Sequence, residues 1–341
     1  MKKKVLLAVP LGLRDEKIFS DGHRDDTFER FRLLRDYLKD EGVELTTELK
    51  EPFTSYIAAI FPFGSNSSYS SELDIPHKIL ILTESKYISP SSYLNSFHEK
   101  FDYVYTWDTD ICKKENYERL FYSSSLTARF DPLKVRESLA VSVFSNKKAR
   151  GVNVPGDLYE ARIDIIKYAS KTNVDFDLYG MGWDEYYFGG NKYMRYFNAL
   201  PLAKSFMNIF YKPPKCYRGA IENKKKILQK YNFNICPENF CAQRGYITEK
   251  IWDSLVSGAV PVYQGPEDIG DILPGELFID LGGFSSPAEM FGFLKDFSES
   301  ELLAKRKIIF NFLKDNAEGE FSSIYFAKKI RDKVIGQLRF L

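Results

Sequence analysis

Four polar segments of the sequence carry side chains suited to group-transfer chemistry. Three of them directly follow short apolar runs of the kind that form buried strands, and the fourth begins a predicted helix. The segments are Glu84-Ser85-Lys86, Ser145-Asn146-Lys147-Lys148, Pro237-Glu238-Asn239 and Gly245-Tyr246-Ile247-Thr248-Glu249-Lys250. Ligands of open parallel sheets bind beyond the carboxyl ends of the strands, so these side chains are candidates for a binding site.

The fourth segment predicts an anion site. A helix over residues 248–257 buries Ile251, Trp252 and Leu255 against a sheet, which leaves its amino end, with its unpaired N–H groups, facing the ligand. Lys250 is unfavourable at that end of the helix dipole unless an anion lies close by. Arg162, in the second turn of another predicted helix, raises the same question. The alternative is that both are solvated cations. Neither GxxxxGK[ST] nor GxGxxG is present.

Apolar runs and amphipathic stretches alternate along the chain, a pattern typical of α/β domains with parallel sheets. Two such sets, joined near residues 128–138, predict two Rossmann-like domains facing a cleft. The predicted strands cover residues 4–9, 56–61, 78–83, 139–144, 174–179, 233–236 and 259–263. The predicted helices cover residues 27–40, 157–169, 219–230 and 248–257.

The predicted domains are residues 1–130 and residues 139–315, which the resemblance described below implies to be an acceptor domain and a donor domain. Residues 316–341 are expected to form an amphipathic helix that returns to the domain pair. Because Lys328, Lys329, Arg331, Lys333 and Arg339 share this segment, contact with a membrane surface is the alternative. An aromatic insertion over about residues 181–218 predicts a local hydrophobic cluster or, alternatively, a lobe that faces the acceptor or a membrane.

Composition excludes several classes of site. The 341 residues include 48 basic and 47 acidic side chains, so no overall positive charge points to nucleic acid. The four cysteines form no CxxC pair and the three histidines are scattered, which gives no zinc, haem or disulfide framework. The apolar run after the first lysines contains Pro10 and Gly12 and lacks a cleavage site, so a buried strand is favoured over a signal peptide. A reduced cytoplasmic protein is expected, with peripheral contact at the inner membrane face as an alternative.

One long stretch resembles a known family. Residues 233–239 (FNICPEN), 245–252 (GYITEKIW) and 258–266 (GAVPVYQGP) resemble the signature of the α1,3/4-fucosyltransferases, glycosyltransferase family ten. Weaker similarity covers Val143-Phe144-Ser145-Asn146 with Arg162, residues 105–111 (YTWDTDI) and Thr83-Glu84-Ser85. The family's Phe-Glu-Asn is Pro237-Glu238-Asn239 here, and roughly the first 75 residues show hardly any similarity.

The resemblance implies a two-domain GT-B fold and an inverting fucosyltransferase that uses GDP-fucose without a metal or other cofactor. Glu84 would be the catalytic base, while Arg162 and Lys250 would hold the diphosphate with Ser145 and Asn146. Ribose or fucose would lie against Asn239, Tyr246 and Glu249. By analogy, the acceptor would be a hydroxyl of a Gal/GlcNAc-type glycan, linked α1,3 or α1,4, in lipopolysaccharide or another bacterial surface polysaccharide. The family's Lewis-antigen and protein glycosylation reactions suggest related acceptors.

Two alternatives remain at this stage. Asp108-Thr109-Asp110 is a DxD string, which in metal-dependent GT-A transferases holds a divalent cation under the diphosphate, although such strings often arise by chance. The second alternative is that the chain is a non-catalytic module that binds a nucleotide sugar or a glycan. The sequence gives no indication of oligomeric state.

Overall fold

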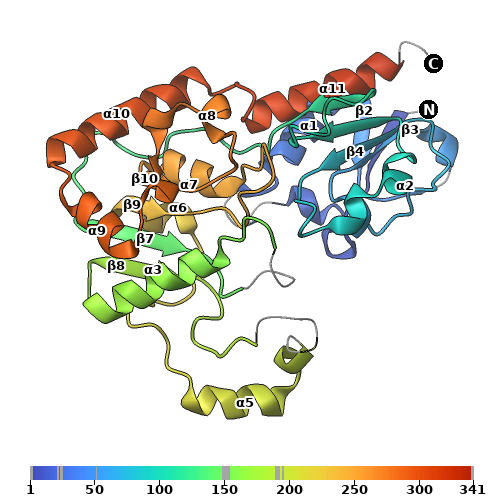
Figure 1. Cartoon of the computed structure of the whole chain (residues 1–341). Coiled ribbons are helices and arrows are strands. Elements are labelled where there is room, and N and C mark those ends of the chain that lie inside the picture. The colour runs from blue at the N-terminus through green and yellow to red at the C-terminus, as the bar shows by residue number, and fades with distance from the viewer. Residues whose placement is uncertain are drawn as a thin grey trace. The chain divides into compact units, whose positions relative to one another are not determined.

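The computed structural model describes residues 3–20, 23, 26–50, 52–147, 154–188, 193 and 196–338. The chain divides into two compact units (Figure 1). Unit 1 comprises residues 1–126 and 316–341, and unit 2 comprises residues 127–315. The chain therefore leaves unit 1 after Leu126 and returns to it at Asn316. The predicted first domain ended at residue 130 and the predicted second domain began at residue 139.

Unit 1 is built on a parallel sheet of six strands in the order β2-β1-β3-β4-β5-β6. All six residues of β3 are buried, which explains its unbroken apolar sequence, since strands of parallel sheets are covered on both faces. The strands are β1 (Lys3–Leu7), β2 (Val43–Thr46), β3 (Tyr56–Phe61), β4 (Lys78–Leu82), β5 (Tyr103–Thr106) and β6 (Tyr117–Arg119). The short helix α2 (Asn95–His98) precedes β5.

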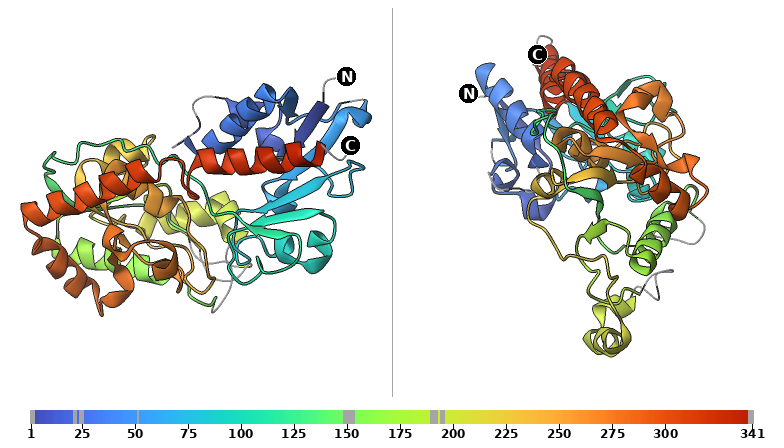
Figure 2. Two further views of the ribbon diagram at one scale, coloured as in Figure 1. Left: turned by 90° about the horizontal axis from the view of Figure 1, so that it is seen from above. Right: turned by 90° about the vertical axis from the view of Figure 1, so that its left-hand side faces the viewer.

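Two helices from opposite ends of the chain cover one face of this sheet. Helix α11 (Ser323–Leu338) lies along α1 (Glu29–Asp40) (Figure 2). Phe326 and Ile330 of α11 pack in one hydrophobic core with Phe31 of α1. Burial of these side chains removes apolar area from water at roughly 25 cal/mol per Å², so the apolar face of α11 is used inside unit 1.

The basic residues of α11 are also engaged within unit 1. Lys329 forms an ion pair with Glu118 at 2.6 Å, and Lys328 forms one with Glu318 at 2.6 Å. The ammonium of Lys333 lies 3.2 Å from the centre of the Tyr103 ring. Arg339 lies outside the described residues. Among the described residues, no helix combines the length and the apolar character needed to cross a bilayer.

Unit 2 contains a parallel sheet of five strands in the order β11-β10-β9-β7-β8. The strands are β7 (Ser138–Val143), β8 (Phe176–Tyr179), β9 (Tyr231–Ile235), β10 (Val260–Tyr263) and β11 (Ile279–Asp280). The helices are α3 (Tyr159–Thr172), α5 (Pro201–Phe210), α6 (Lys224–Leu228), α7 (Glu249–Ser257), α8 (Ile269–Ile272), α9 (Pro287–Lys295) and α10 (Glu299–Asp315).

Most of the elements predicted for the two units are present. All seven predicted strands are found, with ends shifted by up to three residues. Three of the four predicted helices, those near residues 27–40, 157–169 and 248–257, are found within the same limits.

The predicted helix over residues 219–230 is wrong at its amino end. Helix α6 begins only at Lys224, because the side chain of Asn223 caps it by accepting a hydrogen bond from the Lys226 N–H at 2.9 Å. Upstream, Gly219 has a φ of +100°, which is incompatible with a right-handed helix. Its carbonyl instead accepts a hydrogen bond from the Gly180 N–H at 3.0 Å.

The aromatic insertion combines a packed part and an exposed part. The rings of Tyr186, Phe188, Phe197 and Tyr211 contact one another, as expected for a local hydrophobic cluster. Helix α5 has no buried residue. Within unit 2 it lies apart from the sheet (Figures 1 and 2), so a hydrophobic cluster accounts for only half of the insertion.

Candidate functional site

The order of the strands in unit 2 creates a place where a ligand can bind. From β7 the chain moves to β8 on one side, and then to β9 on the other side of β7. The loops after β7 and β9 therefore leave the sheet in opposite directions and open a crevice at its carboxyl edge. Residues 144–147 and 236–239 form these two loops.

A buried carboxylate, that of Glu238, organises this edge. The side chain is 0% exposed and accepts hydrogen bonds at 2.8 Å from both the backbone N–H and the hydroxyl of Thr248, the residue before α7. The hydroxyl of Tyr263, at the end of β10, donates to it at 3.1 Å, and the Lys250 ammonium lies 2.8 Å away. A buried charge is stable only when it is paired and hydrogen-bonded, and Glu238 meets both conditions.

The anion expected beside Lys250 is therefore part of the protein. Burial lowers the pKa of Lys250, but the carboxylates of Glu238 and Glu249 outweigh burial and raise it. The ammonium donates to Glu238 and, at 2.7 Å, to the Thr248 hydroxyl. An ammonium has three N–H donors, of which described residues accept two, and 15% of this side chain is exposed, so the third N–H can meet a ligand.

Arg162, on α3, is a buried cation with no carboxylate partner in the part of the chain that the structure describes. Only 4% of the residue is exposed, and its Nη2 donates to the carbonyls of Pro237 and Glu238 at 2.7 and 2.6 Å. No described residue accepts a hydrogen bond from its Nε, and burial lowers the pKa of the guanidinium. Since an uncompensated buried charge is unfavourable, Arg162 is suited to bind an anionic group.

The other predicted donor residues lie at the same edge. Asn239 accepts from Arg162 at 3.2 Å and donates to the Tyr246 hydroxyl at 3.5 Å. Glu249 lies 3.8 Å from Lys250 with 46% of its side chain exposed. Arg162, Asn239, Tyr246, Glu249 and Lys250 thus form one connected group.

Ser145 and Asn146 approach this group from the neighbouring loop after β7. The Asn146 amide donates to the Gly182 carbonyl at 2.9 Å, which fixes the loop, and Phe144 places its ring 5.1 Å from the Arg162 guanidinium. Within the described ranges, the Asn146 amide bonds to Gly182 and not to a residue of the connected group, and Ser145 has no hydrogen bond to that group.

A cavity of about 270 Å³ opens on the same side of unit 2. Gln264 follows β10 and Gly282 follows β11, so both belong to the carboxyl edge of the sheet. The first two turns of α3 form the opposite wall, with Ala161 and Asp164. The edge therefore combines fixed charges with an adjacent space.

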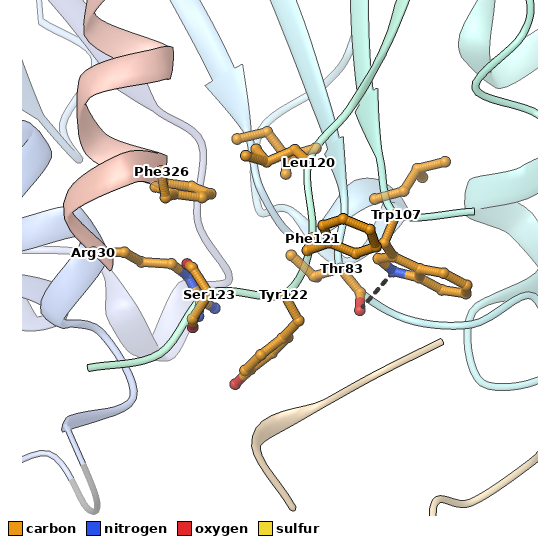
Figure 3. A pocket seen from close by; sticks show the side chains of 10 residues that line it. Arg30, Thr83, Trp107, Leu120, Phe121, Tyr122, Ser123 and Phe326 are labelled. Carbon is orange, nitrogen blue, oxygen red and sulfur yellow. Dashed lines mark hydrogen bonds between the residues drawn. The ribbon is translucent and has the colours of Figure 1, made fainter. Parts of the chain in front are cut away.

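In unit 1, Glu84 is exposed and follows β4. Its backbone is held on both sides: the Trp107 indole donates to the Thr83 carbonyl at 3.3 Å, and the Tyr93 hydroxyl donates to the Glu84 carbonyl at 2.9 Å. Figure 3 shows Trp107 and Thr83 at the rim of a small cavity, which Arg30 also lines. Its volume of about 10 Å³ suits a single water molecule.

A cluster of serines supports the loops beside Glu84. The Ser92 hydroxyl lies 2.7 Å from that of Ser89 and 3.0 Å from that of Ser65. Gly64 has a φ of +52°, and a Cβ at that position would lie 2.3 Å from the Ser92 oxygen. Glycine is required there, so the loop is fixed by close packing as well as by hydrogen bonds.

The DxD string has a local role in the backbone. The buried Asp108 carboxylate accepts hydrogen bonds from the N–H groups of Asp110 and Ile111, at 3.0 and 3.3 Å, and so stabilises the turn after β5. The described residues contain no group of three or more His, Cys, Asp or Glu side chains arranged for a metal ion. The geometry of Asp108 favours the turn over the metal-site alternative.

Sequence reasoning placed Glu238 in a candidate segment but assigned it no role in the site. Two signals pointed to it: its position directly after a buried strand, and the need for an anion near Lys250. Arg30, in unit 1, was missed. It is 5% exposed, donates to the Ser123 carbonyl at 3.0 Å and lies over the Tyr122 ring at 4.8 Å.

Comparison with known proteins identifies the family that part of unit 2 matches. Residues 161–306 match the model of glycosyltransferase family 10 (fucosyltransferase), C-terminal part. This part of the chain belongs to glycosyltransferase family 10. The family 10 region includes the whole connected group and also Glu238, which joins Arg162 to Lys250.

Two curated relatives share short regions with the chain. GDP-fucose protein O-fucosyltransferase 3 of Xenopus tropicalis is 31% identical over 111 residues, which cover 32% of this chain and 22% of the relative. Alpha-(1,3)-fucosyltransferase FucT of Helicobacter pylori is 32% identical over 75 residues, 22% of this chain and 16% of the relative. The chain thus matches only about a fifth of the length of these relatives.

A solved structure extends the similarity to the whole fold. The crystal structure of alpha1,3-fucosyltransferase with GDP superposes with a TM-score of 0.52 at 16% identity, covering 99% of this chain and 89% of the other. The fold is therefore of the GT-B type, with two α/β units that each contain a parallel sheet. The first 75 residues, where the sequence shows hardly any family similarity, also lie within the superposed region.

Proposed function

We propose that this protein transfers fucose from GDP-fucose to a hydroxyl group of an acceptor. The observation that carries the proposal is Arg162, a buried guanidinium that has no carboxylate partner among the described residues and lies at the carboxyl edge of a family 10 domain. A nucleotide diphosphate supplies the negative charge that this position lacks. The names of the relatives, all of them fucosyltransferases, support GDP-fucose as the donor.

The leaving group is stabilised by protein groups alone in this proposal. As the bond from fucose C1 to the diphosphate breaks, GDP gains negative charge. Arg162, the remaining N–H of Lys250 and the amino end of α7 are fixed donors for that charge, joined by Ser145 and Asn146. Asn239, Tyr246 and Glu249 hold ribose or fucose. No divalent metal is required in this scheme.

Glu84 acts as the base in the same scheme. Its carboxylate takes the proton of the acceptor hydroxyl while the acceptor oxygen forms a bond to fucose C1 on the face opposite GDP. The configuration at C1 is thereby inverted. A positioned base contributes about 10²–10⁴-fold to the rate, and the hydrogen bonds to the Thr83 and Glu84 carbonyls support such positioning.

For the acceptor we propose a Gal/GlcNAc-type glycan of a bacterial surface polysaccharide, free or lipid-linked, with an α1,3 or α1,4 linkage. The Helicobacter pylori relative is named as an α1,3-fucosyltransferase, which supports a glycan hydroxyl. The Xenopus tropicalis relative is named as a protein O-fucosyltransferase, which supports a Ser or Thr hydroxyl as a second acceptor class.

The test is a donor and acceptor screen with the full chain. GDP-fucose, GDP-mannose and UDP-glucose are each incubated with Gal–GlcNAc glycans and with Ser/Thr peptides, with and without EDTA, and released nucleotide and glycosylated product are measured. We expect product from GDP-fucose only, at an equal rate in EDTA. Binding of GDP without release from any donor would identify a non-catalytic module, and loss of activity in EDTA would overturn the metal-free scheme.

A further inference from the structure

Helix α5 in the insertion of unit 2 exposes a continuous apolar face. Leu202, Phe206, Ile209 and Phe210 are 87%, 61%, 73% and 69% exposed. Their spacing places all four on one side of the helix. Exposed apolar side chains scattered singly are ordinary, but a contiguous group on one face indicates an interaction surface.

The opposite face of α5 fastens the helix to the rest of the insertion. Lys204 forms an ion pair with Glu185, and the Asn208 side chain accepts a hydrogen bond from the Tyr186 N–H at 2.7 Å. After the helix, the Tyr211 hydroxyl donates to the Trp183 carbonyl at 3.1 Å. These contacts use the polar groups of α5 internally and leave the apolar face turned outward.

The charge around α5 restricts what can cover this face. The sequence has no acidic residue between Glu185 and Glu222, although Asp and Glu make up 47 of the 341 residues. Lys212 and Lys215 follow the helix directly, are exposed and have no partner among the described residues. An apolar face bordered by the exposed lysines Lys212 and Lys215 complements an apolar layer bordered by negative charge.

The anchoring of the insertion links this surface to the donor edge of unit 2. The Trp183 indole is 4% exposed and donates at 2.7 Å to the carbonyl of Phe144, in the loop after β7. The aromatic side chains beside α5, Tyr193 and Tyr196, are 71% and 65% exposed. Amphipathic aromatic rings prefer the boundary between headgroups and acyl chains.

We propose that the α5 face, defined by Leu202, Phe206, Ile209 and Phe210, binds the surface of an anionic phospholipid bilayer. The apolar side chains insert at the acyl boundary, and Lys212 and Lys215 contact the headgroup phosphates. The apolar face of α11 is packed on α1, so α5 and not the carboxyl-terminal helix makes this contact.

The experiment measures co-sedimentation of the full chain with vesicles. One set is phosphatidylcholine alone, and the other is phosphatidylcholine and phosphatidylglycerol in equal parts. We expect binding to the anionic set that falls about tenfold or more in the triple variant Phe206→Ser, Ile209→Ser, Phe210→Ser, and less in Lys212→Gln, Lys215→Gln. Exposed apolar residues outside the insertion give the matched control, Leu133→Ser with Val135→Ser, which should bind as wild type.

Several results would overturn the proposal. One is wild-type protein that does not sediment with anionic vesicles, and another is a triple variant that binds as well as wild type. Sedimentation velocity without lipid tests the second-copy alternative: a wild-type dimer that the triple variant abolishes, in a protein that ignores vesicles, assigns the face to self-association. Circular dichroism and GDP affinity should be equal in all variants, because α5 buries no residue of its own.

Discussion

The sheets of the two units carry different kinds of side chains at their carboxyl edges. In unit 2 the edge is a network of charges, in which Glu238, Lys250 and Arg162 are buried and joined by hydrogen bonds. In unit 1 the edge is a network of serine hydroxyls beside an exposed carboxylate, Glu84. Fixed charges suit a ligand that is itself strongly charged, whereas an exposed acid beside a rigid serine network suits proton transfer to and from a sugar.

The largest effect expected from this contrast is on the stability of unit 2. Glu238→Gln removes the negative partner of Lys250 in a buried pair, which costs about 3 kcal/mol, the lower end of the usual range because Lys250 retains some exposure. Urea denaturation followed by tryptophan fluorescence measures the loss. The control is Glu249→Gln, whose half-exposed carboxylate lies 3.8 Å from Lys250 and should cost about 0.5 kcal/mol. Equal losses in the two variants would mean that the network is not organised around Glu238.

The next effect concerns turnover alone. Glu84→Gln should lower the rate of transfer by about 100-fold or more and leave GDP-fucose affinity and stability unchanged, because the exposed carboxyl contributes a proton acceptor and little packing. Product formation and donor affinity are measured separately. Glu115→Gln, another exposed acid of unit 1, serves as the control. If transfer by Glu84→Gln equals that of the control, the base lies elsewhere.

A smaller effect, on GDP affinity, is expected when the positive charge at position 162 is kept but the guanidinium is replaced. Arg162→Lys retains a cation at the donor edge and removes the planar fork that holds the Pro237 and Glu238 carbonyls. GDP affinity, measured by calorimetry, should fall about tenfold. Lys171→Arg, on an exposed turn of the same helix, should leave it unchanged. Unaltered GDP affinity in Arg162→Lys would show that the diphosphate does not use this guanidinium.

The smallest effect is expected at the turn after β5. Asp110→Asn should leave transfer within about twofold of wild type, since the turn is held by the Asp108 carboxylate accepting from backbone N–H groups. Activity with and without added Mn²⁺ is the measurement. A large loss that Mn²⁺ partly restores would revive the metal-dependent alternative and make the unit 1 edge a charged site as well.

Much of the fold was predictable because its central strands are long apolar runs. Residues 56–61 and 78–82 have no polar interruption after their first residue, and both lie inside the unit 1 sheet. The strands that were missed, β2, β5, β6 and β11, have two to four residues and mix polar with apolar side chains. In such short segments tertiary pairing, rather than local pattern, decides the structure.

The candidate site was predictable in its location and less so in its chemistry. Strand ends and a helix start placed all the donor residues at one edge of unit 2, since parallel strands end on the same side. The pairing of Lys250 with Glu238 depends on β9 and α7 lying side by side, which spacing along the sequence does not encode. An external anion was therefore expected where the protein supplies its own.

The return of residues 316–338 to unit 1 has a consequence for biosynthesis. While the ribosome is still translating unit 2, all six strands of the first sheet have already been synthesised. Helix α11, whose Ile330 packs in one core with Phe31 of α1, is not yet made. The nascent amino-terminal unit therefore has an uncovered apolar surface until residues 323–338 have been synthesised. A nonsense mutation between residues 316 and 323 removes α11 and leaves that surface open, although Arg162, Glu238 and Lys250 have already been synthesised.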